Sequence, residues 1–116
     1  MEQQAKSKIW KIRTVKDYTE AHNHVLVGQV LDHNEAYIRL HCRSYHFGKV
    51  VNLPKDVNEG ILMVRIVPWH RVEIVNELAA SFNYMNARVT TDKDGDVVLK
   101  DDTYTCSLIY RHDKRF

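Results

Sequence analysis

Residues 36–46, Ala-Tyr-Ile-Arg-Leu-His-Cys-Arg-Ser-Tyr-His, alternate in character over five steps. One set of alternate positions is mostly small or aliphatic: Ala36, Ile38, Leu40 and Cys42. The other set is aromatic and basic: Tyr37, Arg39, His41, Arg43 and Tyr45. A period of two is typical of a β-strand that turns one face to the core. The stretch therefore predicts a strand, and with it a mainly β fold.

The residues before this strand predict a second strand and a turn. Residues 25–32 form an apolar run, and the glycine inside it, Gly28, indicates a bend, a bulge or a close approach of two backbones. His33-Asn34-Glu35 then reads as a compact polar turn. Further upstream, residues 3–13 predict a short N-terminal helix, because Ala5, Ile9 and Ile12 share one stripe. The β-branched residues from Ile9 onward leave a strand as the alternative.

The rest of the chain predicts more short strands. We expect a loop over 47–60 with a short strand at 49–53, a buried strand over 61–67 that Pro68 ends, and a strand over 72–75. Residues 77–86 predict at least one helical turn. Residues 88–91 and 96–100, joined by an Asp-Gly turn, predict a β-hairpin, and 103–110 a last strand. This pattern favours an antiparallel barrel or sandwich over residues 1–78, with a C-terminal extension over 79–116.

Composition excludes several classes of protein. The chain has 116 residues, 44% of them hydrophobic and 28% charged, which is typical of one globular domain rather than a disordered or membrane protein. The longest apolar stretch, 61–67, is too short for a membrane span. Cys42 and Cys106 show no metal-binding spacing. We therefore expect a cytoplasmic protein with reduced thiols and no membrane partner.

Two groups of residues could bind a ligand. In the strand above, Arg39, His41 and Arg43 alternate with tyrosines, so that phosphates could pair with the cations while bases stack on the rings. The alternative is an ordinary solvated strand face. Pro68 is followed by Trp69, His70 and Arg71, which would expose a stacking ring, an imidazole and a guanidinium on one tight connection. The alternative there is that Trp69 is a core residue and His70 caps a turn.

These two regions resemble the Sm-like superfamily, which comprises the Sm and LSm ring proteins and the bacterial RNA chaperone Hfq. Residues 28–40, Gly-Gln-Val-Leu-Asp-His-Asn-Glu-Ala-Tyr-Ile-Arg-Leu, look like the first motif of that family, and residues 68–74, Pro-Trp-His-Arg-Val-Glu-Ile, look like the second. The resemblance covers residues 22–76. It implies a small, strongly bent antiparallel barrel of the SH3-like kind that assembles into rings by pairing of edge strands. It also implies that single-stranded RNA binds through the two motif turns.

The motif residues carry over only in part. His70 matches the histidine of the second turn, whereas His33 and Asn34 stand where an aromatic and an acidic residue are usual. Glu35 and Ala36 replace the glutamine and the stacking phenylalanine of the RNA chaperone, and Pro68 and Trp69 replace a tyrosine-lysine pair. Trp69 is therefore the one obvious stacking residue. The first strand of the family would fall at 15–21, which is unusually polar, and residues 77–116 have no counterpart in the family fold.

The sequence offers little for metal binding or catalysis. His22 and His24 share a face if the chain is extended there, yet no third ligand has a recognisable spacing. No phosphate-binding loop, nucleophile elbow or zinc-protease motif occurs. Cys42 lies on the apolar face, where a buried thiol is expected. We predict no metal, no cofactor and no enzymatic activity.

The leading hypothesis is a non-enzymatic, ring-like homo-oligomer that binds single-stranded RNA. Trp69, His70, Arg71, His33 and Asn34 would line the nucleotide site, while Arg39, His41 and Arg43 would steer phosphates. Binding should weaken with salt and strengthen as the pH falls through the histidine range. The alternative is a structural or protein-interaction module without nucleic acid. Residues 24–78 hold six basic and six acidic residues, and the formal net charge of the chain is only +2. Such a balance attracts polyanions weakly, which favours this alternative.

Overall fold

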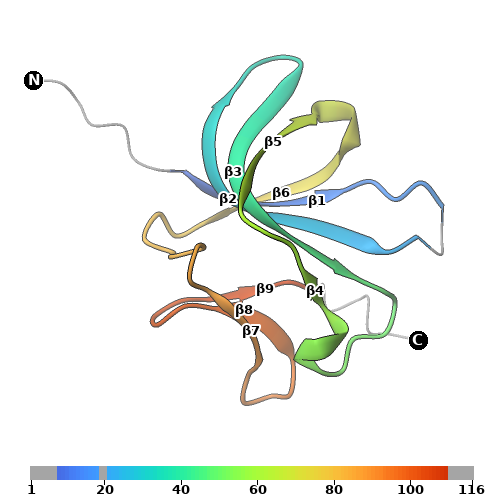
Figure 1. Cartoon of the computed structure of the whole chain (residues 1–116), viewed down its shortest axis with the longest axis vertical. Helices are drawn as coiled ribbons and strands as arrows, with labels where there is room; N and C mark the ends of the chain where they lie inside the picture. Colours follow the sequence, from blue (N-terminus) through green and yellow to red (C-terminus); the bar gives the residue numbers. More distant parts are fainter. Residues whose placement is uncertain (1–7, 19–20, 110–116) are drawn as a thin grey trace, which may run out of the picture.

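The computed structural model describes residues 8–18 and 21–109, and the described chain is mainly β (Figure 1). Nine strands appear in the order β1 (Ile9–Thr14), β2 (Asn23–His33), β3 (Tyr37–Phe47), β4 (Asn58–Glu59), β5 (Met63–Pro68), β6 (Val72–Leu78), β7 (Arg88–Thr91), β8 (Val97–Lys100) and β9 (Thr105–Ser107). Two short 3-10 turns, η1 (Pro54–Asp56) and η2 (Trp69–Arg71), lie between strands. The prediction of a mainly β fold is confirmed.

The strands form two antiparallel sheets. The larger has the order β4-β3-β2-β1-β6, with β5 also paired to β3, and the smaller has the order β7-β8-β9. Consecutive strands β1, β2 and β3 are neighbours, and η2 links β5 to β6, the strands that pair with β3 and with β1. The η2 turn therefore connects the two flanks of the larger sheet through three residues.

The N-terminal helix predicted over 3–13 is wrong for the residues that the structure describes. Residues 9–14 form β1, and residues 3–7 lie outside the described part. β1 pairs with β2 on one side and with β6 on the other, and five of its six residues are buried. A helix would bury one stripe only, whereas a central strand buries both faces and satisfies its backbone on both edges. The strand expected at 15–21 is replaced by this earlier one.

Other expectations need correction as well. No strand forms at 49–53, where η1 and β4 follow an irregular segment, and turns replace the helical turn expected over 77–86. β5 was expected to be buried, but of its six residues only Val67 is. The hairpin over 88–100 is confirmed, with Gly95 at a φ of 85° in the turn. β9 extends that hairpin to three strands.

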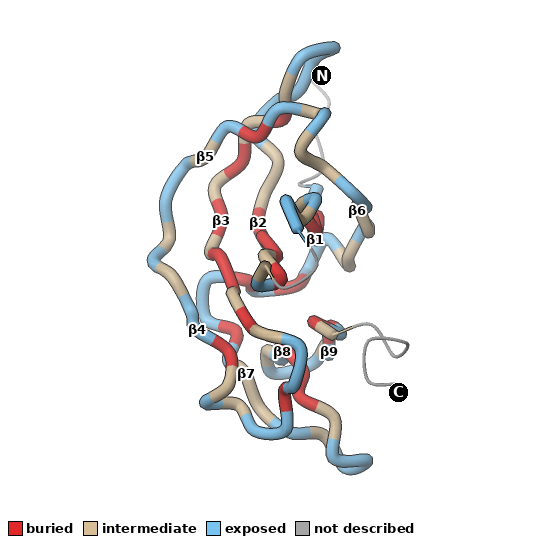
Figure 2. Tube along the Cα trace, turned by 90° about the vertical axis from the view of Figure 1, so that its right-hand side faces the viewer, coloured by how far each residue is buried: buried red, intermediate tan, exposed pale blue. Residues whose placement is uncertain are grey.

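Many residues of strands β1–β3 are buried (Figure 2), and their apolar side chains belong to two clusters, one on each face. One face packs inside the larger sheet, and its cluster comprises Trp10, Ile12, Leu26, Ile38, Leu40, Cys42 and Val67. The other face packs against the smaller sheet, and its cluster includes Val25, Val27, Tyr45, Phe47, Phe82, Val97, Leu99 and Leu108. The Lys11 ammonium on this second face donates to the Ser107 carbonyl at 2.6 Å. The C-terminal extension therefore shares a core with the larger sheet.

Candidate nucleic-acid interface

The two turns singled out in the sequence meet at one rim of the larger sheet. The indole Nε1 of Trp69 donates to the Asn34 carbonyl at 2.6 Å, and its backbone N–H donates to the Ala36 carbonyl at 3.1 Å. These bonds fix η2 against the turn between β2 and β3. Gly28 in β2 and His70 in η2 therefore belong to the same sheet, the first in a strand and the second in the turn that joins β5 to β6.

Asn34 shapes this turn. Its side-chain oxygen accepts the N–H groups of Ala36 at 2.8 Å and Tyr37 at 3.0 Å. An asparagine that bonds the backbone two and three residues ahead stabilises a tight turn. The predicted ligand role of Asn34 thus competes with a structural role that the side chain already performs.

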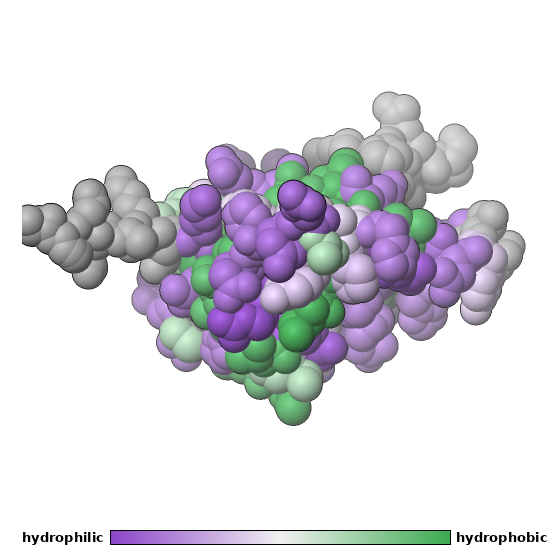
Figure 3. All heavy atoms as spheres, turned by 90° about the horizontal axis from the view of Figure 1, so that it is seen from above, coloured by the Kyte–Doolittle hydropathy of each residue, from purple (hydrophilic) through white to green (hydrophobic). Residues whose placement is uncertain are grey.

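Aromatic rings gather at the same rim. The His33 ring lies 5.6 Å from Trp10 and 6.3 Å from Trp69, measured between centroids, and meets Trp69 edge to face. His33 and His70 are exposed, Trp69 is half-buried, and Trp10 is buried. Figure 3, which views the end of the molecule that carries these turns, shows polar side chains bordering a hydrophobic surface. The rim therefore carries exposed imidazole rings next to the rings of Trp10 and Trp69.

Trp10 is a member of this rim that the sequence reasoning missed. It stands opposite Gly28 in the pairing of β1 with β2. Once residues 9–14 are taken as the strand that the β-branched run allows, Trp10 and Ile12 fall on one face. The alternation was therefore visible, but the helical interpretation hid it.

The two arginines predicted beside the rim are held by carboxylates. Arg39 donates through Nε to Asp32 at 2.9 Å and through a second nitrogen to the same oxygen, and these hydrogen bonds and the charge of Asp32 raise the pKa of Arg39. Arg71 donates to Asp17 at 2.8 Å. Both guanidiniums carry a local counter-charge, which reduces their attraction for phosphate.

His41 and Arg43 lie elsewhere, at the junction between the two sheets. His41 Nδ1 is 2.7 Å from the Tyr84 hydroxyl, and Arg43 donates to the carbonyls of Gly60 at 3.1 Å and Met85 at 3.3 Å. Tyr45 on the same face is fully buried. The expected continuous face from Tyr37 to Tyr45 is thus partly covered, and the eight predicted site residues do not share one surface.

Cys42 is buried as expected. Burial outweighs the opposing effect of Arg65 and raises the pKa of its thiol to about 11. A thiol with that pKa is almost entirely protonated at neutral pH and is a poor nucleophile. Cys106 is also buried, and neither cysteine forms a disulfide.

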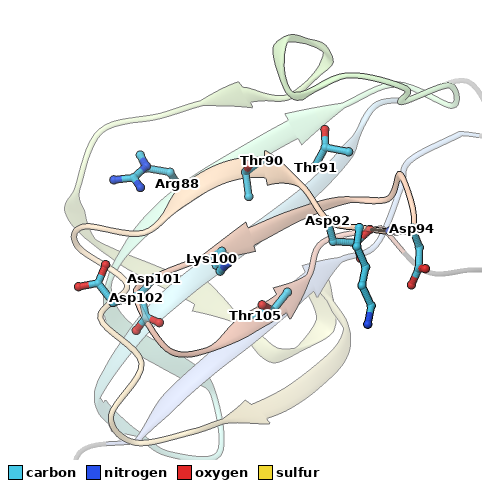
Figure 4. A pocket seen from close by; sticks show the side chains of 10 residues that line it. Arg88, Thr90, Thr91, Asp92, Asp94, Lys100, Asp101, Asp102 and Thr105 are labelled. Atoms are coloured by element: carbon cyan, nitrogen blue, oxygen red, sulfur yellow. Dashed lines mark hydrogen bonds between the residues drawn. The ribbon is translucent and has the colours of Figure 1, made fainter.

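A groove of about 700 Å³ lies on the exposed face of the smaller sheet (Figure 4). Arg88, Thr90, Lys100 and Thr105 line it, together with aspartates from the adjoining turns. Two of those aspartates are occupied by their own turns: Asp92 accepts the N–H groups of Asp94 and Asp96, and Asp101 accepts those of Asn83, Thr103 and Tyr104. The groove is polar, open and without aromatic residues, so it lacks the features of a small-molecule site.

Two searches of the described residues gave negative results. Within residues 8–18 and 21–109, no three His, Cys, Asp or Glu side chains are grouped so that they could hold a metal ion. In the same residues, no helix has the length and apolar character needed to cross a membrane. Comparisons with protein-family models, with curated proteins and with solved structures find no match to this chain.

Proposed function

We propose that this chain is a non-enzymatic, self-associating module of the Sm-like type that binds single-stranded RNA at the rim formed by its two turns. The observation that carries the proposal is the set of hydrogen bonds that joins η2 to the β2–β3 turn. They bring Trp69 next to His33, and His70 is the next residue of the same η2 turn. Exposed rings on a rigid rim are what base stacking requires.

The strand order supports the Sm-like part of the proposal. The order β6-β1-β2-β3-β5 has its two flanking strands consecutive in the chain and joined by η2. The described strands do not close into a barrel. A short link between the two flanking strands favours strong curvature of the sheet, which is the curvature that a small barrel needs. Both stretches that carry the sequence resemblance contribute to this arrangement, since residues 28–40 span β2 and β3 and residues 68–74 span η2 and the start of β6.

Two strand edges support self-association. β5 pairs only with β3, and β6 pairs only with β1, among the residues that the structure describes. β5 also exposes apolar side chains on its outer surface, with Val64 48% and Ile66 60% accessible. An exposed apolar edge strand invites pairing with another chain. Pairing of β5 of one copy with β6 of the next would form a head-to-tail interface, which closes into a ring when the rotation between copies allows.

The charges at the rim refine the expected RNA chemistry. Arg39 and Arg71 are paired with Asp32 and Asp17, so stacking and hydrogen bonding should contribute more than phosphate pairing. We therefore expect a shallower salt dependence than a free arginine rim would give. His33 is exposed, so its ring remains accessible to a base.

Fluorescence anisotropy with labelled oligo-U and oligo-A tests the RNA proposal. Wild type should bind at low salt, and His70→Ala should weaken binding about tenfold, because one stacking contact is worth about 1–2 kcal/mol. Lys93→Ala, an exposed substitution on the smaller sheet, serves as the control and should bind as wild type does. No binding by wild type, or equal binding by His70→Ala, would contradict the proposal.

A second function, a protein-interaction module without nucleic acid, is favoured by the apolar surface of β5. Light scattering separates it from the first. Ile66→Lys should convert an oligomer to a monomer if β5 forms the interface, and Lys100→Ala, on the smaller sheet, should leave the oligomer intact. An oligomer that is sensitive to Ile66→Lys but binds neither RNA probe would favour the second function. A wild-type protein that is monomeric at all concentrations would contradict self-association in both.

A further inference from the structure

Two histidines and an arginine lie on the inner face of the larger sheet, and none of the three is among the residues named so far as ligands. His24 in β2 and His46 in β3 are direct partners across the strands, and their rings stack with centroids 4.1 Å apart and an angle of 13°. They continue the face that carries Leu26 and Ser44. Arg65 comes from β5, where it stands opposite Leu40 on the same face. We call these three side chains the histidine–arginine cluster.

Positive charges act on both histidines of the cluster. The pKa of His24 is lowered to about 4, first by burial and then by the charges of His46, Arg65 and Arg71. Burial also lowers the pKa of His46, with His22 and Arg65 acting in the same direction. Arg65 is hydrogen-bonded to the side chain of Cys42, whose thiol is protonated at neutral pH because burial raises its pKa. Asp17 is occupied by Arg71.

Hydrogen-bonding atoms of the cluster lack partners. His24 Nε2 and Arg65 Nε are both inaccessible to solvent, and neither has a hydrogen-bond partner in the part of the chain that the structure describes. Buried polar atoms are nearly always satisfied by protein, water or an ion. Because the charge of Arg65 acts on both histidines, the two unsatisfied atoms point to one missing hydrogen-bond acceptor. The backbone of Gly60 packs against Ser44 next to the cluster and donates to the Ser44 carbonyl at 2.8 Å.

We propose that the histidine–arginine cluster binds a phosphate group, either inorganic phosphate or the phosphoryl group of a nucleotide. A tetrahedral oxyanion accepts several hydrogen bonds at once and supplies the missing negative charge. Arginine and imidazolium groups together form a common donor set for it. The site is independent of the RNA rim, because it uses neither η2 nor the β2–β3 turn as a ligand.

The cluster should bind its anion more tightly as the pH falls. A bound anion favours the protonated imidazoles, so by linkage each proton gained strengthens binding. Sulfate is the better probe of this effect, because it remains a dianion over the whole range whereas phosphate changes its own charge. We expect sulfate affinity to rise at least fivefold between pH 7.5 and pH 5.5.

Histidine ring signals in NMR provide the test. Sodium phosphate, sodium sulfate and uridine monophosphate are each titrated into the wild-type chain at constant ionic strength, with sodium chloride replaced in step. The proposal expects saturable shifts of the His24 and His46 rings and a raised pKa for both. Tighter binding of the nucleotide than of phosphate would assign the phosphoryl group of a nucleotide, and equal binding would assign inorganic phosphate. The absence of a saturable shift with all three probes would overturn the proposal.

Substitutions locate the site. Arg65→Gln should lower sulfate affinity at least tenfold, and Arg88→Gln, which removes a cation from the smaller sheet, should leave it unchanged. Binding by Arg65→Gln that equals wild type would overturn the proposal. If Arg65→Gln does not fold, His46→Asn takes its place in this comparison, alongside the ring titration of the wild type. His70→Ala should keep sulfate affinity, which separates this site from the RNA proposal.

Discussion

Gly28 shows how a single residue permits the larger sheet to form. A Cβ built at this position would lie 2.0 Å from the His41 carbonyl oxygen and 2.5 Å from the Cα of Cys42. β2 and β3 therefore approach so closely that any side chain collides with backbone. The sequence predicted a bend, a bulge or a close approach at Gly28, and the structure selects the close approach.

Gly28→Ala should destabilise the fold by about 3 kcal/mol, because a methyl group forced against backbone cannot be accommodated by rotation of a side chain. Urea unfolding measures the change. Gly48→Ala is the matched control, since the nearest atom to a Cβ there is 3.9 Å away on the His22 ring. Equal stabilities of the two variants would contradict the close approach of β2 and β3.

His24 should make stability depend on pH. Its folded pKa is lowered to about 4 from the ordinary histidine value of 6.5, so the unfolded chain takes up a proton first as the pH falls. This contribution is fully present above pH 6.5 and is lost between pH 6.5 and about 4. Because the ring is half exposed, solvent screening reduces the loss to about 1 kcal/mol.

Chemical denaturation at several pH values, in a buffer free of phosphate and sulfate, tests this dependence. His24→Gln should flatten the stability profile between pH 4 and 6.5 relative to wild type. His70→Gln removes an exposed histidine outside the cluster and serves as the control, so its profile should follow wild type. A wild-type profile identical to that of His24→Gln would refute the prediction.

Among the elements, β2 and β3 show why the face of a strand was easier to predict than its register. The alternation over residues 36–46 correctly separated the two faces of β3. The pairing, however, shifts between Val30 and Asp32, where Leu31 is an extra residue in β2. One inserted residue moves all later partners by one position. The stacking of His24 on His46 depends on this bulge, and nothing in the run of apolar residues marks Leu31 as its site.

β5 was predicted to be buried because residues 61–67 are almost continuously apolar. Such a run is typical of a strand covered on both faces. In the structure the strand lies at an edge, and Val64 and Ile66 face outward. The amino-acid composition of a strand indicates that its faces can be buried. Whether they are covered depends on the other elements, or other chains, that pack against the strand. This mismatch is the reason to test β5 as an interface.

Asp101 joins the smaller sheet to the segment that precedes it. One carboxylate oxygen accepts the N–H groups of Thr103 and Tyr104 in the β8–β9 turn, and the other accepts that of Asn83. The backbone hydrogen bond from Asn83, followed by that from Thr103, lowers the pKa of Asp101. We expect Asp101→Ala to lower the urea midpoint, whereas Asp102→Ala, at the exposed neighbour, should leave it near wild type.

Asp101→Asn gives a finer test of the same turn. The amide oxygen preserves one acceptor, so its midpoint should lie between those of wild type and Asp101→Ala. Since the folded pKa of Asp101 is lowered, its contribution is present above the unfolded pKa and is lost as the pH falls through the folded value. A midpoint of Asp101→Ala no lower than that of Asp102→Ala would show that the carboxylate does not hold the turn.

At the scale of the whole molecule, the sequence led us to expect that the two turns meet, but it did not predict which charges surround them. The resemblance to the Sm-like superfamily implied that the turns holding His33, Asn34 and Trp69 share one rim, and in the structure these turns meet. The partner of Arg71 is Asp17, 54 residues earlier, in a segment that sequence reasoning assigned to a strand. His41 and Arg43 were expected in solvent because the smaller sheet was treated as an appendage. Long-range packing therefore decided which cations remain at the rim.

The shared core predicts that the two sheets unfold together. Leu99 in β8 is fully buried in the cluster that also holds Val25, Tyr45 and Phe47 of the larger sheet. Leu99→Ala should therefore cost about 3 kcal/mol, as a cavity in a packed core does. Leu53→Ala makes the same chemical change at a side chain that is 49% exposed, and it should cost less than about 1 kcal/mol.

Two probes in different clusters can follow the transition in the Leu99→Ala variant. Trp10 reports on the cluster inside the larger sheet through its fluorescence, once Trp69 is replaced by Phe. Cys106 reports on the cluster between the sheets through its reaction with a thiol reagent in a Cys42→Ala background. Because strands β1–β3 contribute one face to each cluster, both probes should give the same denaturant midpoint, and Leu99→Ala should move both equally. If Cys106 became reactive at a denaturant concentration that left Trp10 native, residues 79–109 would be a unit that unfolds on its own, and the larger sheet would be stable without it.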